Sequence, residues 1–453
     1  GSKPPIRGGA GVRTAQRQSP YCGVMTHADL LTRHQNVLPS WLALFYDQPI
    51  EIASGSGRRV TDGAGNSYLD FFAGILTNML GYDVPEVRTA VERQLATGVV
   101  HSSTLYLIRA QVELAERIAD LSGIPDARVF FTSSGTEANE AALLLATQYR
   151  HSNQVLAMRN SYHGRAFATV AITGNRGWSA SSLSPLQTSY VQGAYPYRSP
   201  FAHLPDAEYI DVCVEDLRDV VATTTAGDVA CMIAEPIQGV GGFATPPDGL
   251  FGAMKKVLDD HGILLISDEV QTGWGRTGEH FWGYQAHDVV PDILTFAKGL
   301  GNGFAIGGVV ARREVMDCLT ANSISTFGGN PVSTTAATAV IDYIIEHDLQ
   351  ANAARVGGQL LTSLRDLATR HPIIGDVRGK GLMAGVELVQ PGTLTPHPEA
   401  AARILEEARE RGLLIGKGGL HNNVLRIAPP LTVTTDEADE AAGILDAAFT
   451  ADT

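Results

Sequence analysis

The sequence predicts an α/β protein in which a larger domain with a mainly parallel sheet precedes a smaller α/β domain. The chain has 453 residues, of which 44% are hydrophobic and 18% are charged, as in a multi-domain globular protein. Between residues 128 and 311, short apolar runs alternate with amphipathic segments, the pattern of a parallel sheet covered by helices. After residue 335, longer helical patterns alternate with short strands.

Six apolar runs are the predicted strands of the larger sheet. They lie at residues 128–132, 154–158, 229–234, 263–267, 293–297 and 306–311. The spacing of apolar residues predicts helices at 111–121 and 138–146 in this domain, and at 336–346, 351–370 and 398–411 in the smaller one. Further strands are predicted at 50–53, 68–72, 384–388 and 413–416.

These patterns divide the chain into four parts. Residues 1–25 are polar, basic and rich in Gly and Pro, which predicts a mobile tail without a secretion signal. Residues 26–75 have no core of their own, so we expect them to pack on the smaller domain or on a partner subunit. Residues 76–335 form the predicted larger domain, and residues 336–453 form the smaller one.

Charge, cysteine and histidine usage argue against several functions. The formal net charge is −14 and no dense run of Lys and Arg occurs, so we expect no nucleic-acid partner. The longest uncharged stretch, residues 318–341, contains Pro331 and many Ser, Thr and Asn residues, so we expect no membrane span. Four scattered cysteines and 13 histidines form no disulfide or metal pattern, which favours a cytoplasmic protein without a metal.

Lys298 is the most informative residue, because it follows an apolar run and precedes the glycine-rich turn 299–303. A lysine is usually a solvated surface charge. At the C-terminal end of a strand in an α/β sheet, where ligands bind, partial burial would instead lower its pKa and free its amine for Schiff-base chemistry. Its position alone leaves both interpretations open.

Asp268 follows another apolar run, 263–267. An aspartate at such a junction commonly caps a turn or a helix. Alternatively, its carboxylate faces a pyridinium nitrogen and keeps it protonated, so that the ring accepts electrons from a developing carbanion. The presence of Lys298 after a neighbouring strand favours the second interpretation.

The segment from Ser134 to Glu137 predicts both a helix start and a phosphate site. Ser134 and Glu137 have the spacing of a capping box. Gly135 and Thr136 would then offer backbone N–H groups and a hydroxyl at the positive end of the helix, where a phosphate ester binds. The two interpretations are compatible.

The segment Gly273–Gly278 matches the dinucleotide-binding pattern G-x-G-x-x-G. No helical pattern follows it, and the bulky Trp274 lies inside the turn. We therefore interpret it as an ordinary glycine-rich loop.

With these residues assembled, the chain resembles the class III (subgroup II) aminotransferases, enzymes of fold type I that use pyridoxal 5′-phosphate. The resemblance covers about residues 40 to 450. It rests on motifs in the family's order: SSGTEANE at 133–140, SYHGR at 161–165, AEPIQG at 234–239, SDEVQTGWGRTG at 267–278, FAKGLGNG at 296–303, TFGGNP at 326–331 and RIAPPLT at 426–432.

The resemblance implies a role for each matching residue. Lys298 would form a Schiff base with the cofactor and move a proton between the substrate and the cofactor, and Asp268 would pair with the pyridine nitrogen. Tyr162 would stack on the ring. The other residues implied at the cofactor are Ser134, Gly135 and Thr136 at the phosphate, Gln271 near the ring hydroxyl, and His163, Val270 and Glu235.

Three of the matching residues concern the partner subunit, the substrate carboxylate and an acid with two possible roles. Thr326 would complete the phosphate site of the neighbouring subunit, so the resemblance implies a homodimer and leaves a dimer of dimers open. Arg426 matches the family's carboxylate receptor, a role that suits a planar guanidinium. Glu235 is open to a second interpretation, as a carboxylate that caps a strand or supports residues around the cofactor.

One departure from the family bears on the substrate. The 4-aminobutyrate and ornithine aminotransferases carry a glutamate five positions after the acid of the E-P-I-Q stretch, where it masks the arginine. This chain has Val240 there, so Arg426 should stay available to a carboxylate in both half-reactions, which argues against those two activities.

The nearest branch of the family is that of the alanine–glyoxylate and 3-aminoisobutyrate–pyruvate aminotransferases, to judge from residues 279–303 and 373–390. The branch's G-H-x-H-P stretch is Gly81-Tyr-Asp-Val-Pro85 here, and the cysteine-rich insertion of the animal enzymes is missing near 195–210. The substrate pocket is therefore expected to differ in its geometry.

We therefore expect a ping-pong transaminase. It would move an amino group from L-alanine, 3-aminoisobutyrate or a related amine to a 2-oxo acid such as glyoxylate or pyruvate. The main rival activity is that of a phospho-lyase acting on a phosphorylated amine, a group that typically has Pro where this chain has Gly299. A racemase, a decarboxylase and a cofactor-binding protein without catalysis stay open as well.

Overall fold

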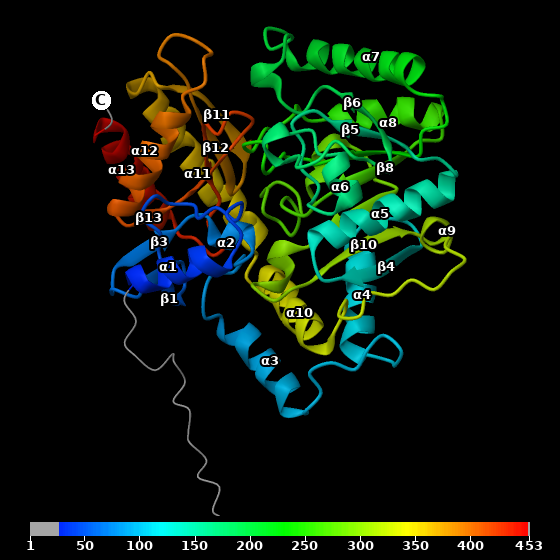
Figure 1. Cartoon of the computed structure of the whole chain (residues 1–453), viewed down its shortest axis with the longest axis horizontal. Coiled ribbons are helices and arrows are strands. Elements are labelled where there is room, and N and C mark those ends of the chain that lie inside the picture. Colours follow the sequence, from blue (N-terminus) through cyan, green and yellow to red (C-terminus); the bar gives the residue numbers. More distant parts are fainter. Residues whose placement is uncertain (1–26, 452–453) are drawn as a thin grey trace, which may run out of the picture. The chain divides into compact units, whose positions relative to one another are not determined.

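The computed structural model describes residues 27–451 (Figure 1). The predicted tail, residues 1–25, lies outside the described residues. The chain divides into two units, residues 1–51 and 52–453. The described part of the first unit contains the helix α1 (His27–Val37), which buries none of its side chains. All other elements belong to the second unit.

A seven-stranded sheet forms the centre of the second unit, with the strand order β4-β10-β9-β8-β7-β5-β6. Strand β10 runs antiparallel to both of its neighbours, and the pairs from β9 to β6 are parallel, so the predicted mainly parallel sheet is confirmed. The strands are β4 (Ala127–Thr132), β5 (Gln154–Met158), β6 (Gln187–Val191), β7 (Cys231–Ala234), β8 (Leu264–Asp268), β9 (Ile293–Phe296) and β10 (Gly307–Arg312).

Helices cover both faces of this sheet. Successive side chains of a strand point to opposite faces, so alternate residues of one strand contact different helices. From β5, Leu156 and Met158 share a buried cluster with side chains of α7 (Asp206–Thr224) and α8 (Leu250–Asp260). The alternate residues Val155 and Ala157 share a cluster with α5 (Gly135–Arg150). Strands β7, β8 and β9 are buried on both faces, which explains why they are continuous apolar runs in the sequence.

Two four-stranded sheets accompany the large one. Strands β11 (Ile374–Lys380), β12 (Met383–Leu388), β15 (Val424–Ile427) and β14 (Gly416–Gly418) form an antiparallel sheet in that order. Strands β1 (Ile52–Ser56), β2 (Arg59–Asp62) and β3 (Ser67–Asp70) join β13 (Leu413–Leu414) in the other. The single strand predicted at 413–416 is thus two strands, because the chain leaves one sheet and enters the other within this segment.

The remaining helices pack around these sheets. The longest, α11 (Leu349–Arg370), contacts β11 and α13 (Thr435–Ala451). The others are α2 (Ala73–Leu76), α3 (Pro85–Ala96), α4 (Arg109–Leu121), α6 (Phe167–Ala171), α9 (Arg313–Met316), α10 (Pro331–Glu346) and α12 (Pro398–Glu410), with short 3₁₀ turns at Arg176–Trp178, Pro196–Arg198, Gly283–His287 and Lys298–Gly301.

Two absences hold for residues 27–451. No helix in this range combines the length and the apolar composition that crossing a bilayer requires. No group of three or more His, Cys, Asp or Glu side chains in it is placed to hold a metal ion.

Candidate active site

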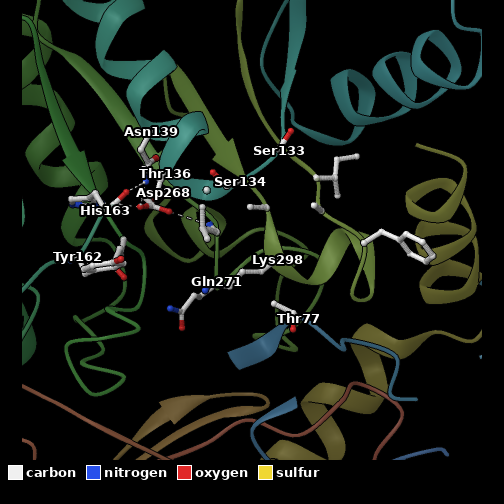
Figure 2. A pocket seen from close by; sticks show the side chains of 18 of the residues that line it. Thr77, Ser133, Ser134, Thr136, Asn139, Tyr162, His163, Asp268, Gln271 and Lys298 are labelled. Atoms are coloured by element: carbon white, nitrogen blue, oxygen red, sulfur yellow. Dashed lines mark hydrogen bonds and ion pairs between the residues drawn. The ribbon is translucent and has the colours of Figure 1, made fainter. Parts of the chain in front are cut away.

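A cavity of about 370 Å³ opens at the C-terminal edge of the large sheet, where ligands of α/β proteins bind (Figure 2). Glu235 follows β7, Asp268 ends β8 and Lys298 follows β9, so three neighbouring strands deliver them to one place. Ten sequence-predicted residues line the cavity: Ser134, Gly135, Thr136, Tyr162, His163, Glu235, Asp268, Val270, Gln271 and Lys298. Arg426 and Thr326 do not line it.

Lys298 lies in a strained and partly buried position. Its φ is +45°, in the left-handed region that costs energy for a residue with a side chain and that is found at functional sites. Burial lowers the pKa of its amine to about 8, and the positive charge of Arg426 adds to this, against the opposing effect of Asp268 and Glu235. A larger fraction of the amine is therefore neutral and nucleophilic at physiological pH.

The carboxylate of Asp268 is held from one side by a buried network (Figure 2). Its Oδ2 accepts a hydrogen bond of 2.8 Å from Asn139 Nδ2 and lies 2.8 Å from His163 Nδ1. Asn139 is itself oriented, because its Oδ1 accepts a 2.7 Å hydrogen bond from Thr295 Oγ1. The Oδ1 atom of Asp268 accepts from the backbone N–H of Val270 at 3.1 Å.

Asn139 is not among the sequence-predicted residues, although one signal for it exists. It is fully buried on α5 among Ala138 and Ala142, where an apolar residue would be expected. A polar residue on a buried helix face needs a specific partner. Only the structure shows that this partner is Asp268, which lies 129 residues away in the sequence.

The helix α5 begins after Ser134, as the sequence predicted, but only one of the two bonds of the capping box forms, because Glu137 accepts from the backbone N–H of Ser133 and not from that of Ser134. Ser134 Oγ accepts a hydrogen bond of 3.2 Å from the N–H of Glu137, and Glu137 Oε2 accepts one of 2.8 Å from the N–H of Ser133. A Cβ atom at Gly135 would lie 3.0 Å from a methyl carbon of Val270, so the close approach of this loop favours glycine. The positive end of a sixteen-residue helix therefore faces the cavity through small residues.

Glu235 connects two parts of the site. Its Oε1 accepts a 2.9 Å hydrogen bond from the N–H of Tyr162, and its Oε2 accepts a 2.8 Å hydrogen bond from the N–H of Gly239. Burial raises the pKa of this carboxyl to about 7. The ring of Tyr162 meets that of Trp178 edge to face, with 5.4 Å between the ring centres.

Arg426 and Thr326 lie outside the cavity lining. Arg426, on β15, is buried, donates from Nη1 to the carbonyl of Gly239 at 3.2 Å and stacks 4.8 Å from the ring centre of Phe72. Burial lowers the pKa of its guanidinium to about 10, and its Nε has no hydrogen-bond partner among residues 27–451. Thr326 is exposed on the loop before α10.

The residues at the cavity fit pyridoxal 5′-phosphate. Two buried polar atoms, His163 Nε2 and Gln271 Oε1, have no hydrogen-bond partner in the described part of the chain, as expected of side chains that await a ligand. The cavity offers an amine of lowered pKa for an aldehyde, a carboxylate for a ring nitrogen and a helix N-terminus for a phosphate. Its volume lies within the usual range for small-molecule sites.

Comparisons with known proteins agree with this chemistry. The sequence profile of the family "Aminotransferase class-III" matches residues 45–449. The chain is 43% identical over 426 residues to alanine–glyoxylate aminotransferase 2 homolog 2, mitochondrial, of Arabidopsis thaliana, covering 93% of this chain and 87% of the relative.

Two solved structures show the same fold. One is an amine transaminase from an uncultivated Pseudomonas species with bound pyridoxal phosphate, at a TM-score of 0.85 and 33% identity, covering 89% of this chain and 95% of that one. The other is a phospholyase from Arthrobacter in complex with phosphoethanolamine, at a TM-score of 0.85 and 34% identity, covering 93% and 99%. The chain belongs to the class III aminotransferases, and it is a fold type I enzyme that catalyses transamination with pyridoxal 5′-phosphate as its cofactor.

Proposed function

We propose that this protein transfers the amino group of L-alanine, 3-aminoisobutyrate or a related amine to glyoxylate or pyruvate. The observation that carries this proposal is the environment of Arg426. The position from which a glutamate would mask it holds the buried Val240, and its guanidinium donates to the neutral carbonyl of Gly239. A substrate carboxylate binds a guanidinium more strongly than a carbonyl does, so small amino and oxo acids can compete for it in both half-reactions.

The chain's own residues divide the work in this proposal. Pyridoxal 5′-phosphate supplies an electron sink when it is bound. Lys298 would hold the cofactor through its amine and, once the substrate amine has displaced it, would move a proton at the substrate carbon. Asp268, oriented by Asn139 and His163, keeps the ring nitrogen protonated. Ser134, Gly135 and Thr136 would bind the phosphate and Tyr162 would contact the ring, while Gln271, Val270 and Glu235 line the same cavity.

The proposal includes a homodimer in which Thr326 serves the partner's phosphate site. Thr326 lies between two strongly exposed apolar side chains, Ile324 and Phe327. The ring of Phe327 contacts that of His101, 5.0 Å away, close to the exposed Leu105, Tyr106 and Leu107 in the sequence. Exposed apolar side chains grouped in this way favour a protein interface, and a second copy of the chain fits this one.

A cytoplasmic location remains part of the proposal. It rests on cysteine usage, since Cys213, Cys231 and Cys318 are all free thiols in the structure. The mitochondrial location in the name of the Arabidopsis relative belongs to that protein.

The first test is the absorbance spectrum of the holoenzyme mixed with single amines and no acceptor. We expect L-alanine or 3-aminoisobutyrate to replace the absorbance band of the pyridoxal form, near the edge of the visible range, with that of the pyridoxamine form. Glyoxylate or pyruvate should then restore the band of the pyridoxal form. Phosphate release from phosphoethanolamine without any 2-oxo acid would instead indicate a phospho-lyase. Scrambling of chirality or release of carbon dioxide, without band exchange, would indicate a racemase or a decarboxylase.

A further inference from the structure

A second cavity, larger than the cofactor cavity, lies at the same edge of the large sheet. It has a volume of about 910 Å³, and the two cavities share no lining residue. Arg159 and Asn160 follow β5, and residues 192–195 follow β6, so the cavity occupies the C-terminal ends of two neighbouring parallel strands. Ligands of α/β proteins bind at such strand ends, and the volume suits a small metabolite.

The lining of this cavity is positively charged. It contains Arg159, Arg176 and Arg198 and no Asp or Glu. Arg198 already has a partner, because its Nε donates to Glu387 Oε1 at 2.6 Å. Arg159 and Arg176 are exposed and pair with no carboxylate among residues 27–451. In a chain with a net charge of −14, two unpaired cations beside one cavity create a local positive potential.

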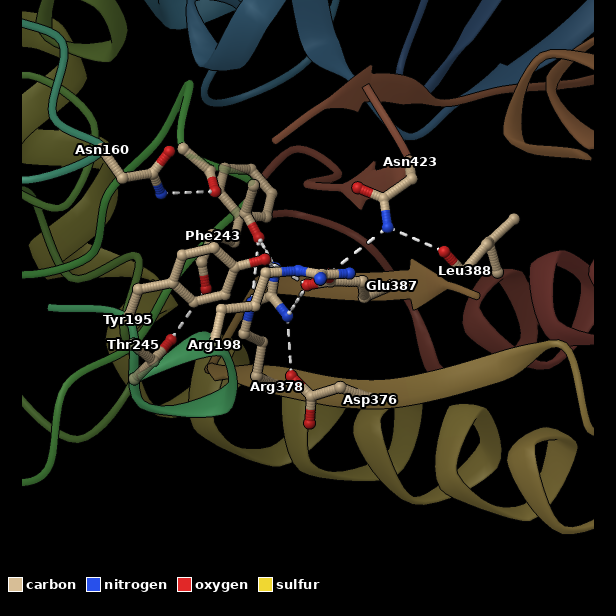
Figure 3. A network of polar contacts seen from close by, with 12 residues as sticks. Asn160, Tyr195, Arg198, Phe243, Thr245, Asp376, Arg378, Glu387, Leu388 and Asn423 are labelled. Carbon is tan, nitrogen blue, oxygen red and sulfur yellow. Dashed lines mark hydrogen bonds and ion pairs between the residues drawn. The ribbon is translucent and has the colours of Figure 1, made fainter. Parts of the chain in front are cut away.

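Contacts outside the lining hold several of the cavity's polar side chains in place. Asn160 donates to Gln238 Oε1 at 3.0 Å, and Gln192 donates to Asp216 at 3.3 Å. The hydroxyl of Tyr190 donates to the carbonyl of Ala171 at 3.2 Å. Tyr195 and Arg198 both donate hydrogen bonds to the carboxylate of Glu387 (Figure 3). The wall is therefore formed before any ligand arrives, as in most small-molecule sites.

We propose that this cavity binds a small, multiply charged anion that carries phosphate or carboxylate groups. Arg159 and Arg176 supply the planar donors that such groups favour. The serine-rich loop at 179–182 adds hydroxyls to the same lining. This site is separate from the proposed substrate and cofactor residues, so its occupancy does not depend on the identity of the amino donor.

The same loop connects the second cavity to the first. Trp178 lies between the lining residues Arg176 and Ser179, and its ring meets that of Tyr162 in the cofactor cavity. Trp178 is half exposed, whereas Trp274 and Trp282 are buried. An anion in the second cavity is therefore expected to change the fluorescence of Trp178.

The test is calorimetric titration of the holoenzyme with pyrophosphate and separately with citrate at constant ionic strength. In the holoenzyme the cofactor already occupies the proposed phosphate site at Ser134, Gly135 and Thr136, so the probes cannot bind there. We expect one of these probes to bind, and the double variant R159Q/R176Q to bind it at least about tenfold more weakly. The control is R365Q, which removes an exposed arginine of α11 without a carboxylate partner in the described chain and should leave the affinity unchanged. Pyrophosphate alone would identify a phosphate ligand, and citrate alone a carboxylate ligand.

Fluorescence locates the binding event independently. The probe that binds should change the tryptophan emission of the wild-type holoenzyme, and W178F should lose the change while it keeps the calorimetric affinity. The proposal is overturned if neither probe binds at millimolar concentration, if R159Q/R176Q binds as tightly as R365Q, or if binding leaves the emission of Trp178 unchanged.

Discussion

Lys298 has an unfavourable local environment, which the role proposed for it would require. A buried amine would be charged in the unfolded chain but loses part of its charge in the fold, since burial lowers its pKa to about 8 from an ordinary value of 10.5. The left-handed backbone at the same residue adds strain. The two strands that lead to the site on either side of this strain, β8 and β9, are fully buried, and their packing offsets both costs.

Replacing Lys298 with Met should abolish transamination and stabilise the apoenzyme at neutral pH. The cost of burying the charged amine is fully present below pH 8 and disappears above pH 10.5, so the gain at pH 7 is on the order of 3 kcal/mol and shrinks as the pH rises. Urea unfolding of the apo forms at pH 7 and pH 10 measures it. The control K417M should change neither property, and residual turnover of K298M would remove Lys298 from its proposed role.

Asn139 is the residue whose role came from the structure alone, and its replacement with Ala should weaken cofactor binding. A hydrogen bond to a charged group contributes about 1.5–3 kcal/mol, so losing the bond to Asp268 should raise the Kd for pyridoxal phosphate about 10- to 100-fold. Titration of the apoenzyme by absorbance measures this Kd. N153A, an exposed asparagine after α5, is the control. Equal Kd values for the two variants would contradict the role.

Val240 tests the availability of Arg426. V240E places a carboxylate where the 4-aminobutyrate and ornithine enzymes have one, and it should pair with the guanidinium and exclude the substrate carboxylate. We expect the KM for pyruvate or glyoxylate to rise about tenfold or more, with a smaller change in kcat. Steady-state kinetics of V240E and of the uncharged V240Q measure the effect. Similar KM values in both variants would mean that volume, and not charge, matters at this position.

At the scale of elements, strands that are buried on both faces were the most predictable. The predicted runs 154–158 and 293–297 match β5 and β9 almost residue for residue, because a continuous apolar run has few other structures open to it. Strand β6 was missed because it is an edge strand of mostly half-exposed, polar residues. The split between β13 and β14 was missed because which sheet a two-residue strand joins depends on distant partners.

The same reasoning explains what the sequence could predict of the site. Residues that lie at strand ends, such as Asp268 and Lys298, are recognisable from local pattern. The contacts of Asn139 with Asp268 and of Arg426 with Gly239 join elements far apart in the chain, so no local spacing reveals them. Whether each predicted side chain touches the cofactor remains a prediction.

A polar network joins β11 and β12 to the segment after β6 and to the loop after β7 (Figure 3). Glu387 is fully buried and bonds with Arg378 Nη1 at 2.7 Å, with Arg198 Nε at 2.6 Å and with the hydroxyl of Tyr195. Arg378 also donates to the carbonyl of Gly242 at 2.9 Å. The loop that contains Gly239, the partner of Arg426, is thus held by a second arginine as well.

Replacing Glu387 with Gln should destabilise the fold by roughly 1.5–3 kcal/mol, because it removes one of the two carboxylates that pair with the buried Arg378, the other being Asp376 at 2.6 Å. Burial raises the pKa of Glu387, but the nearby arginines and Tyr195 outweigh it and hold the pKa below its usual value. The carboxylate's contribution is therefore present at pH 7 and is lost as the pH falls through this lowered pKa. Urea unfolding should show that E387Q is less stable than the wild type at pH 7, and that this difference in the free energy of unfolding is smaller at pH 3. The control E410Q, at an exposed glutamate, should be as stable as the wild type at both pH values.

At the scale of the whole molecule, the homodimer proposed above predicts that a partner subunit completes the phosphate site of each chain. The helix N-terminus of α5 is open to the cavity, while Thr326, which the family resemblance assigns to the partner's phosphate, is exposed on a loop flanked by Ile324 and Phe327.

The division of residues 76–453 into a larger and a smaller domain stays a prediction, since residues 52–453 form one unit.

The double variant L105D/L107D should therefore separate the subunits and weaken cofactor binding together. Leu107 is 97% exposed, and charge placed on an interface must be buried without a partner when the dimer forms. Light scattering should give the wild type twice the chain mass of 48.1 kDa and the variant the single mass. L394D, at an exposed leucine elsewhere, should remain dimeric. A monomeric wild type with full activity would contradict the shared site, and a monomeric variant with unchanged affinity for pyridoxal phosphate would show that Thr326 acts within its own chain or not at all.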